Sequence, residues 1–146
     1  MQRELITFQV SGQVFALDIM QIREIRAWSP VTPMPRVPSY VAGVVNLRGT
    51  VLPVVDLAAR LGWAATEATP RHAIIVCHVN GQAQGLIVES VSDIVTFDSE
   101  TLQAPPSTGN DSVVPFLEGL AAIDDNMVMV LDLQALSSAE DGLMAA

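Results

Sequence analysis

The sequence predicts a mainly β protein in which two similar strand-rich units pack side by side, with only short helices. Three observations lead to this fold class. Half of the 146 residues are hydrophobic, and many lie in short segments that alternate apolar with polar residues, as half-buried strands do. Pairs of these segments are separated by short turns that contain glycine, which is typical of β-hairpins. The order of the segments in the first half recurs in the second, which indicates a duplicated unit.

The duplication is visible when the chain is compared with itself. At an offset of 69 residues, Gly12-Gln13 falls on Gly81-Gln82. Farther along, the offset becomes 76, and the segment 54–57 (Val-Val-Asp-Leu) falls on 130–133 (Val-Leu-Asp-Leu). Two matching blocks in the same order, with a small change of offset between them, predict two copies of one fold unit.

Copy one is expected to consist of short strands followed by a helical turn. In chain order, its elements are a hairpin (5–10 and 14–19 around Ser11-Gly12), a strand (22–26), an extended loop (31–38), a second hairpin (43–47 and 51–55) and a helix (56–61). The loop contains three prolines, which cannot donate to a central strand ladder. Asp56 is suited to cap the helix, and Gly62 is suited to end it.

Copy two repeats this order. Its strands are expected near 73–79, 84–89, 91–97, 117–123 and 127–131, followed by a helix from Asp132, with a linker at 64–70 and an internal loop at 104–111. Five short strands are too few for an open sheet, whereas closure into a barrel removes exposed edges. We therefore expect one domain over 1–146 made of two five-stranded, SH3-like barrels: subdomain one over about 1–66 plus a possible C-terminal segment, and subdomain two over about 71–136.

Charge is distributed unevenly between the two halves. Residues 1–71 contain seven Arg and five acidic residues, whereas residues 72–146 contain eleven acidic residues and neither Lys nor Arg. An acidic half repels phosphate groups, so nucleic acid and anionic membranes are not expected as main partners. The acidic excess either serves solubility alone or gives the two halves different preferences for partners.

The sequence also bears on the cellular compartment. Cys77 is the single cysteine, so no disulfide within the chain is possible. No apolar run approaches the ~18–20 residues needed to span a bilayer, and the first residues lack a basic stretch followed by an apolar one. These features predict a cytoplasmic protein that does not insert into the membrane.

The residue types used for catalysis are sparse and poorly placed. His72 and His78 lie in or beside one expected strand, and Cys77 and His78 are neighbours whose side chains point to opposite faces of it. The chain has no Lys, which excludes a phosphate-binding P-loop and a Schiff base. Asp124-Asp125-Asn126 lacks the spacing of a calcium loop and is expected to form a hairpin turn. We therefore expect no enzyme activity, no metal site and no cofactor.

The two copies differ in charge at one equivalent position. Arg48-Gly49, at the second hairpin turn of copy one, falls on Asp124-Asp125 of copy two. A purely structural turn would not require this reversal, and Arg is well suited to interfaces because its planar group makes several directed hydrogen bonds. The alternative is that Arg48 is simply a solvated side chain at a hairpin tip.

Several of these residues also form a pattern that resembles a known family. The stretch 31–57 contains, in order, Met34-Pro35, Gly43-Val44, Asn46-Leu47-Arg48-Gly49 and Asp56-Leu57, which together resemble the signature of the CheW family. The segments 18–26 and 85–94 are similar to it as well, so that the likeness runs from about Ile6 to about Leu136. The family fold of two SH3-like barrels around a common core agrees with the repeat argument.

The resemblance implies an adaptor that couples methyl-accepting chemotaxis receptors to the histidine kinase CheA. The cytoplasmic tip of the receptor would lie in a groove between the barrels, and the regulatory domain of the kinase would meet an end of copy one. The implied receptor-groove residues are Ile22, Glu24, Val91 and Ile94, and the implied coupling residues are Arg48, Gly43, Asn46 and Gly49. The protein would then be cytoplasmic and recruited to receptor arrays at the membrane.

Two other functions remain open at this stage. One is a CheW-like paralogue that serves another chemosensory pathway, such as one controlling pili, which co-purification of its receptor and kinase would reveal. The other is a general SH3-like module that binds proline-rich peptides, since fold alone does not determine function.

Overall fold

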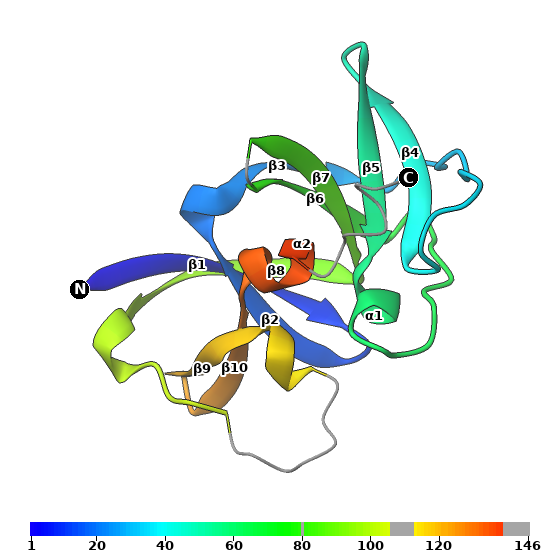
Figure 1. Ribbon diagram of the computed structural model, residues 1–146. Helices are drawn as coiled ribbons and strands as arrows, with labels where there is room; N and C mark the ends of the chain where they lie inside the picture. The colour runs from blue at the N-terminus through cyan, green and yellow to red at the C-terminus, as the bar shows by residue number, and fades with distance from the viewer. Residues whose placement is uncertain (80, 106–112, 139–146) are drawn as a thin grey trace.

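The computed structural model describes residues 1–79, 81–105 and 113–138, in which ten strands form two five-stranded sheets (Figure 1). We call the first unit A and the second unit B. Unit A has the order β8-β1-β2-β10-β9 and comprises β1 (Gln2–Val10), β2 (Gln13–Asp18), β8 (Ser90–Asp98), β9 (Leu117–Ile123) and β10 (Asn126–Leu131). Unit B has the order β3-β6-β7-β5-β4 and comprises β3 (Ile22–Ala27), β4 (Val41–Leu47), β5 (Thr50–Asp56), β6 (Ala73–Val79) and β7 (Gln82–Val88). The expected all-β class with two five-stranded units is confirmed.

The division of the chain between the units differs from the predicted one. Unit B is continuous from β3 to β7, whereas unit A combines β1 and β2 with β8, β9 and β10. The small polar linker at 64–70 suggested a boundary, but it joins α1 (Leu57–Arg60), which follows β5, to β6 within unit B. The chain passes between the units at η1 (Ile19–Gln21), a 3-10 turn, and at Glu89, and these connections are too short to show a change of composition. The contiguous subdomains 1–66 and 71–136 are therefore corrected to these two units.

The predicted duplication is confirmed at the level of strand pairing. The equivalent strands of the two copies are β1 and β6, β2 and β7, β3 and β8, β4 and β9, and β5 and β10. When each strand of unit A is replaced by its equivalent, the order of unit A becomes the order of unit B. The parallel pairing of Ala16 with Val130 in unit A corresponds to that of Gly85 with Val54 in unit B, and the offsets of 69 and 76 residues relate the two pairs. Each unit thus takes its first hairpin from one copy and its remaining strands from the other.

Three apolar cores follow from this arrangement. Each unit has a core of its own, and equivalent residues occupy both, such as Leu5, Val128 and Val130 in unit A against Ile74, Leu52 and Val54 in unit B. A third core lies between the units, which we call the shared core. It takes side chains from both first hairpins and both helices: Phe8, Val10, Phe15, Leu17, Val55, Leu57, Ala58, Leu61, Ile75, Cys77, Val79, Leu86, Val88, Val113, Leu131, Leu133 and Leu136.

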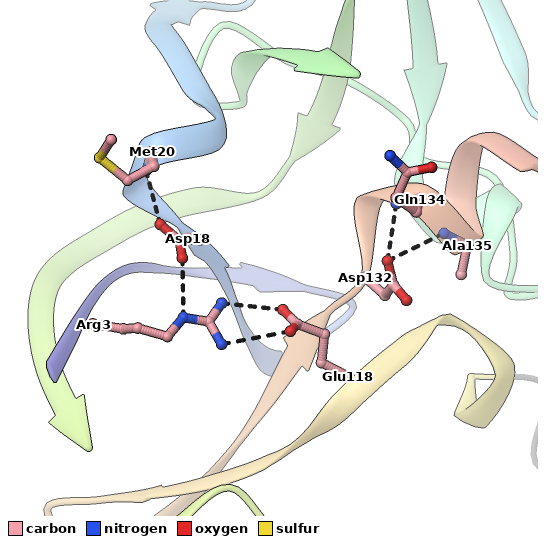
Figure 2. A network of polar contacts seen from close by, with 7 residues as sticks. All are labelled: Arg3, Asp18, Met20, Glu118, Asp132, Gln134 and Ala135. Atoms are coloured by element: carbon pink, nitrogen blue, oxygen red, sulfur yellow. Dashed lines mark hydrogen bonds and ion pairs between the residues drawn. The ribbon is translucent and has the colours of Figure 1, made fainter. Parts of the chain in front are cut away.

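Short helices follow the last strand of each copy, as predicted. Asp56 caps α1, and its carboxylate also accepts hydrogen bonds from the backbone N and the hydroxyl of Thr66 at 2.7 Å each. Asp132 precedes α2 (Leu133–Ser138), and its carboxylate accepts from the backbone N atoms of Gln134 and Ala135 at 2.9 and 3.3 Å (Figure 2). In Figure 1, α2 lies between the two sheets.

Two further 3-10 turns, η2 (Ser99–Thr101) and η3 (Val114–Phe116), were not predicted. The predicted loop at 104–111 is described only at residues 104 and 105; its remainder, and any C-terminal segment beyond residue 138, lie outside the described residues.

Hairpin turns are found where glycine or aspartate pairs predicted them. The tips of β1–β2, β4–β5 and β9–β10 each have two residues with positive φ: Ser11 and Gly12, Arg48 and Gly49, and Asp124 and Asp125. Positive φ at both central residues is the type I′ turn, whose twist matches that of the flanking strands. Arg48 and Asp124 therefore occupy the same backbone geometry with opposite charge.

Candidate functional site

Glu24 and Arg48 meet at one end of unit B. Glu24 lies on β3 and Arg48 at the tip of the β4–β5 hairpin, although β3 and β4 are the two outer strands of the sheet. Nη2 of Arg48 is 2.7 Å from Oε1 of Glu24, so the ion pair connects the hairpin tip to the outer strand on the opposite edge of the sheet. The Arg48 side chain is still 74% exposed, against 32% for Glu24. The guanidinium is therefore positioned by a neighbour and remains accessible to a partner.

A pocket of about 470 Å³ opens beside this ion pair. It is lined by Arg23, Glu24, Leu47, Arg48, Thr50, Val76 and Ala83. We call these residues, together with Asn46 and Gly49, the hairpin-tip surface. It combines two guanidinium groups with one carboxylate around aliphatic side chains, a composition suited to a protein partner.

Three of the predicted coupling residues shape the backbone of this region. Oδ1 of Asn46 accepts a hydrogen bond from the backbone N of Gly49 at 2.8 Å, which holds the turn. Gly43, on β4, packs against the backbone of Thr32: a Cβ on Gly43 would overlap the Thr32 carbonyl group and come 3.1 Å from Cα of Pro33. These contacts explain the residue types structurally, and any role in coupling partners stays a prediction.

The predicted groove residues are placed differently. Ile22 on β3 and Val91 on β8 are partly buried, and both pack against the shared core from different units. Ile94 is 58% exposed and lies on β8, an outer strand of unit A. Glu24, which was predicted for the same groove, contacts Arg48 at the hairpin tip, and its role in receptor binding stays a prediction. Four of the eight predicted residues thus lie at the hairpin tip, Gly43 lies farther along β4 against the loop, and three lie on β3 and β8: Ile22, Val91 and Ile94.

Sequence reasoning missed Ile25. This residue is 40% exposed on β3, the outer strand of unit B equivalent to β8. The offset of 69 residues places Ile25 on Ile94, so the two units expose the same large apolar side chain at the same position. An isoleucine at the same position of both copies was the signal in the sequence that could have indicated this residue.

Unit A has a polar network of its own. Nε of Arg3 on β1 donates to Oδ2 of Asp18 at 3.0 Å, and Nη2 lies 3.2 Å from Oε2 of Glu118 on β9 (Figure 2). Burial alone would lower the pKa of Arg3, but the hydrogen bonds and charges of Glu118 and Asp18 outweigh it and raise the pKa. The guanidinium also lies 5.6 Å from the centre of the Phe97 ring. Because β1 and β9 are not neighbours in the sheet, Arg3 helps to close this barrel.

Other polar residues have structural partners. Nδ1 of His72 accepts from the backbone N of Thr69 at 3.1 Å, and Cys77 is fully buried. Within the described residues, no group of three or more His, Cys, Asp and Glu side chains is placed to hold a metal ion. In the same part of the chain, no helix is long and apolar enough to cross a membrane.

A second pocket, of about 380 Å³, lies where the units meet. It is lined by Ser11, Ala64, Ala65, Thr66, Glu67, His72 and Glu89. None of the predicted groove residues contributes to it.

Comparison with known proteins decides the family. The model of the CheW-like domain matches residues 4–141. The chain belongs to the CheW-like family. Relatives in this family carry the names of chemotaxis and scaffolding proteins, so the coarse class of scaffold and adaptor protein that the resemblance implied is confirmed.

Individual CheW-like relatives match over nearly the whole chain. The chain is 48% identical over 136 residues to "Probable chemotaxis protein CheW" of Rhizobium etli, covering 93% of this chain and 88% of that protein. It is 47% identical over 139 residues to "Chemotaxis protein CheW" of Rhizobium meliloti, covering 95% and 90%. The crystal structure of "scaffolding protein TtCheW" from Thermoanaerobacter tengcongensis superimposes with a TM-score of 0.83 at 31% identity, covering 93% of this chain and 88% of that one.

Proposed function

We propose that this CheW-like protein is a non-enzymatic adaptor that couples methyl-accepting chemotaxis receptors to the histidine kinase CheA. The observation that carries the proposal is the CheW-like match over residues 4–141, in a chain whose predicted site residues lie partly at the hairpin tip and partly on β3 and β8. Two groups on one rigid body suit a protein that holds two partners at once. The proposed location is the cytoplasm, at receptor arrays.

The two groups suit different partners. The receptor tip, a helical hairpin, is proposed to lie along β3 and β8, where Ile22, Val91 and Ile94 offer apolar contacts of the kind that receive an amphipathic helix. The regulatory domain of the kinase is proposed to meet the end of unit B that bears the hairpin-tip surface. There Arg48 offers its remaining donors to carboxylates or carbonyls of the partner.

The adaptor acts by assembly and not by chemistry. Once one partner is bound, binding of the second becomes effectively intramolecular, with an effective concentration on the order of mM. Individually weak contacts are then sufficient for a stable array. A signal passes if the states of the receptor bind the adaptor with different free energies.

Reconstitution tests the proposal. A soluble receptor fragment, the kinase and this protein are combined, and autophosphorylation of the kinase is measured with and without the adaptor. We expect receptor-dependent control of the kinase only when the adaptor is present. Kinase activity that ignores the adaptor, while affinity for proline-rich peptides is found, would replace this function by that of a peptide-binding module.

The hairpin-tip surface is tested by Arg48→Ala. Its effect on folding should be small because the side chain is largely exposed, whereas coupling of receptor to kinase should fall by about tenfold, as for loss of a charged contact at an interface. Arg71→Ala is the control, because Arg71 is exposed, lies between the linker and β6, and carries the same charge. If both variants weaken coupling equally, the effect is one of net charge and the role given to Arg48 fails.

The β3–β8 surface is tested by Ile94→Ser. The control is Met127→Ser on β10 of the same unit, since Met127 is 48% exposed and outside both proposed surfaces. Affinity for the receptor fragment, measured by isothermal titration, should fall for Ile94→Ser and stay unchanged for the control.

A further inference from the structure

Arg60 is a buried cation at the junction of the two units. It lies at the end of α1 with 9% of its surface exposed. Its guanidinium carbon is 4.6 Å from the centre of the Tyr40 ring and 4.4 Å from that of the Phe116 ring. Its Nε and Nη2 donate to the backbone carbonyl of Leu136 in α2, at 3.3 and 2.9 Å.

These partners are related by the internal repeat. The offset of 76 residues places Tyr40 on Phe116 and Arg60 on Leu136. The backbone confirms the equivalence, because the N of Asp56 donates to the carbonyl of Tyr40 at 2.8 Å and the N of Asp132 donates to that of Phe116 at 2.8 Å. Arg60 therefore lies between two equivalent rings and bonds to its own counterpart, which places its guanidinium near the axis that relates the units.

Such a position can hold only one arginine. A second guanidinium at 136 would bring two like charges together in a buried place, which is strongly unfavourable. Leu136 is instead 1% exposed and belongs to the shared core. The duplicated chain is thus asymmetric at its axis, with a cation from unit B held by a ring and a carbonyl from the unit A side.

We propose that Arg60 is the positioning residue that fixes the orientation of unit A relative to unit B. Tyr40 precedes β4 and Arg60 follows β5 of unit B, whereas Phe116 precedes β9 and α2 follows β10 of unit A. Besides the apolar contacts of the shared core, which are not directional, Arg60 supplies two directed hydrogen bonds and one ring contact across the junction, whereas its contact with Tyr40 stays within unit B. Ile22 and Val91 pack on that core from opposite units, so the orientation also sets their separation.

Distances between spin labels test this proposal without any partner. Val51 and Met127 are equivalent positions on the β4–β5 and β9–β10 hairpins, 68% and 48% exposed, and cysteines introduced there are labelled while the buried Cys77 stays inaccessible. In the parent chain, we expect a narrow distance distribution by double electron–electron resonance. With Arg60→Leu, which copies the residue at 136, the distribution should broaden or shift. Exchange of the α2 amides of Ala135 and Leu136 should become about tenfold faster.

Val45→Ala is the control for lost stability. Val45 lies in the core of unit B, so this variant destabilises the fold away from the junction and should leave the distances unchanged. If Arg60→Leu lowers the melting temperature like Val45→Ala but leaves the distance distribution unchanged, Arg60 is only a packing residue and the proposal is overturned. If Arg60→Leu does not fold, the same measurement on Phe116→Leu, which removes one ring, decides between the two outcomes.

Discussion

Replacing Gly43 by alanine tests how the proline-rich loop is held against unit B. Thr32 of this loop forms a bridge to Val44 through two backbone hydrogen bonds of 2.9 Å, one in each direction. A Cβ on Gly43 would overlap the Thr32 carbonyl group, and it would meet backbone atoms that cannot rotate away. Gly43 also has a φ of 153°, which residues with a side chain rarely adopt.

The magnitude follows from these contacts. Each backbone hydrogen bond contributes about 0.5–1.5 kcal/mol, and forced overpacking costs about 1–3 kcal/mol. If the loop moves away, the hydrogen bonds are lost, and if it stays, the overlap remains. Either outcome costs about 1–3 kcal/mol, and the unfavourable φ adds about 1 kcal/mol, so we expect Gly43→Ala to lower the free energy of unfolding by about 2–4 kcal/mol and the melting temperature by about 6–15 °C.

The assay combines thermal unfolding with amide hydrogen exchange. Protection of the Thr32 and Val44 amides should be lost in Gly43→Ala. Gly12→Ala is the control, because Gly12 also has a positive φ of 77° but a Cβ there would meet nothing within 4 Å. The control should lose only about 1–2 kcal/mol and keep both amides protected. Equal destabilisation of the two variants, with Thr32 still protected, would refute the steric argument.

Three further outcomes concern charged groups. A double-mutant cycle on Glu24 and Arg48 should give a coupling of only about 0.2–1 kcal/mol in chemical unfolding, because the pair is exposed to solvent. Arg3→Met should lower the free energy of unfolding by about 1–2 kcal/mol in the same assay, because it leaves the carboxylates of Asp18 and Glu118 without their cation. A hydrogen bond from the backbone, and then the N-terminal ammonium, lower the pKa of Asp98 below its ordinary 3.8. The ionised side chain therefore stabilises the fold at pH values above 3.8, and this stabilisation is lost as the pH falls through the lowered pKa of the folded state. Replacing Asp98 by Asn should therefore flatten the dependence of the melting temperature on pH in acid.

Local elements of this fold were predictable because their signals are local. Type I′ turns need residues that tolerate positive φ, and Arg48-Gly49 and Asp124-Asp125 lie where alternating strands stop on either side. Aspartate before a short apolar helix was likewise enough to place the caps at Asp56 and Asp132. In the same way, prolines between Val31 and Pro38 excluded a central strand.

Partnerships between distant strands were not predictable from these signals. The repeat determines the order of elements within a copy. It does not determine pairing, because a strand with alternating apolar and polar residues can hydrogen-bond equally well to strands of its own copy or of the other copy. The assignment of β1 and β2 to a sheet with β8 and β10 depends on tertiary packing. The approach of the hairpin tip to β3 is equally non-local, which is why no pattern within either segment predicted the contact between Glu24 and Arg48.

The interrupted path of the chain through unit A has a consequence for synthesis on the ribosome. Unit B is complete once Val88 has been made, but the first hairpin, which ends at Asp18, must wait about 70 residues for β8 and about 110 residues for β10, its neighbours in unit A. Translation proceeds from the N-terminus at about 5–20 residues per second, so this delay lasts seconds. Meanwhile Phe8 and Phe15 of the first hairpin are available to pack against the finished unit B, where they contribute to the shared core. Unit A is then completed last, against unit B, which has already folded.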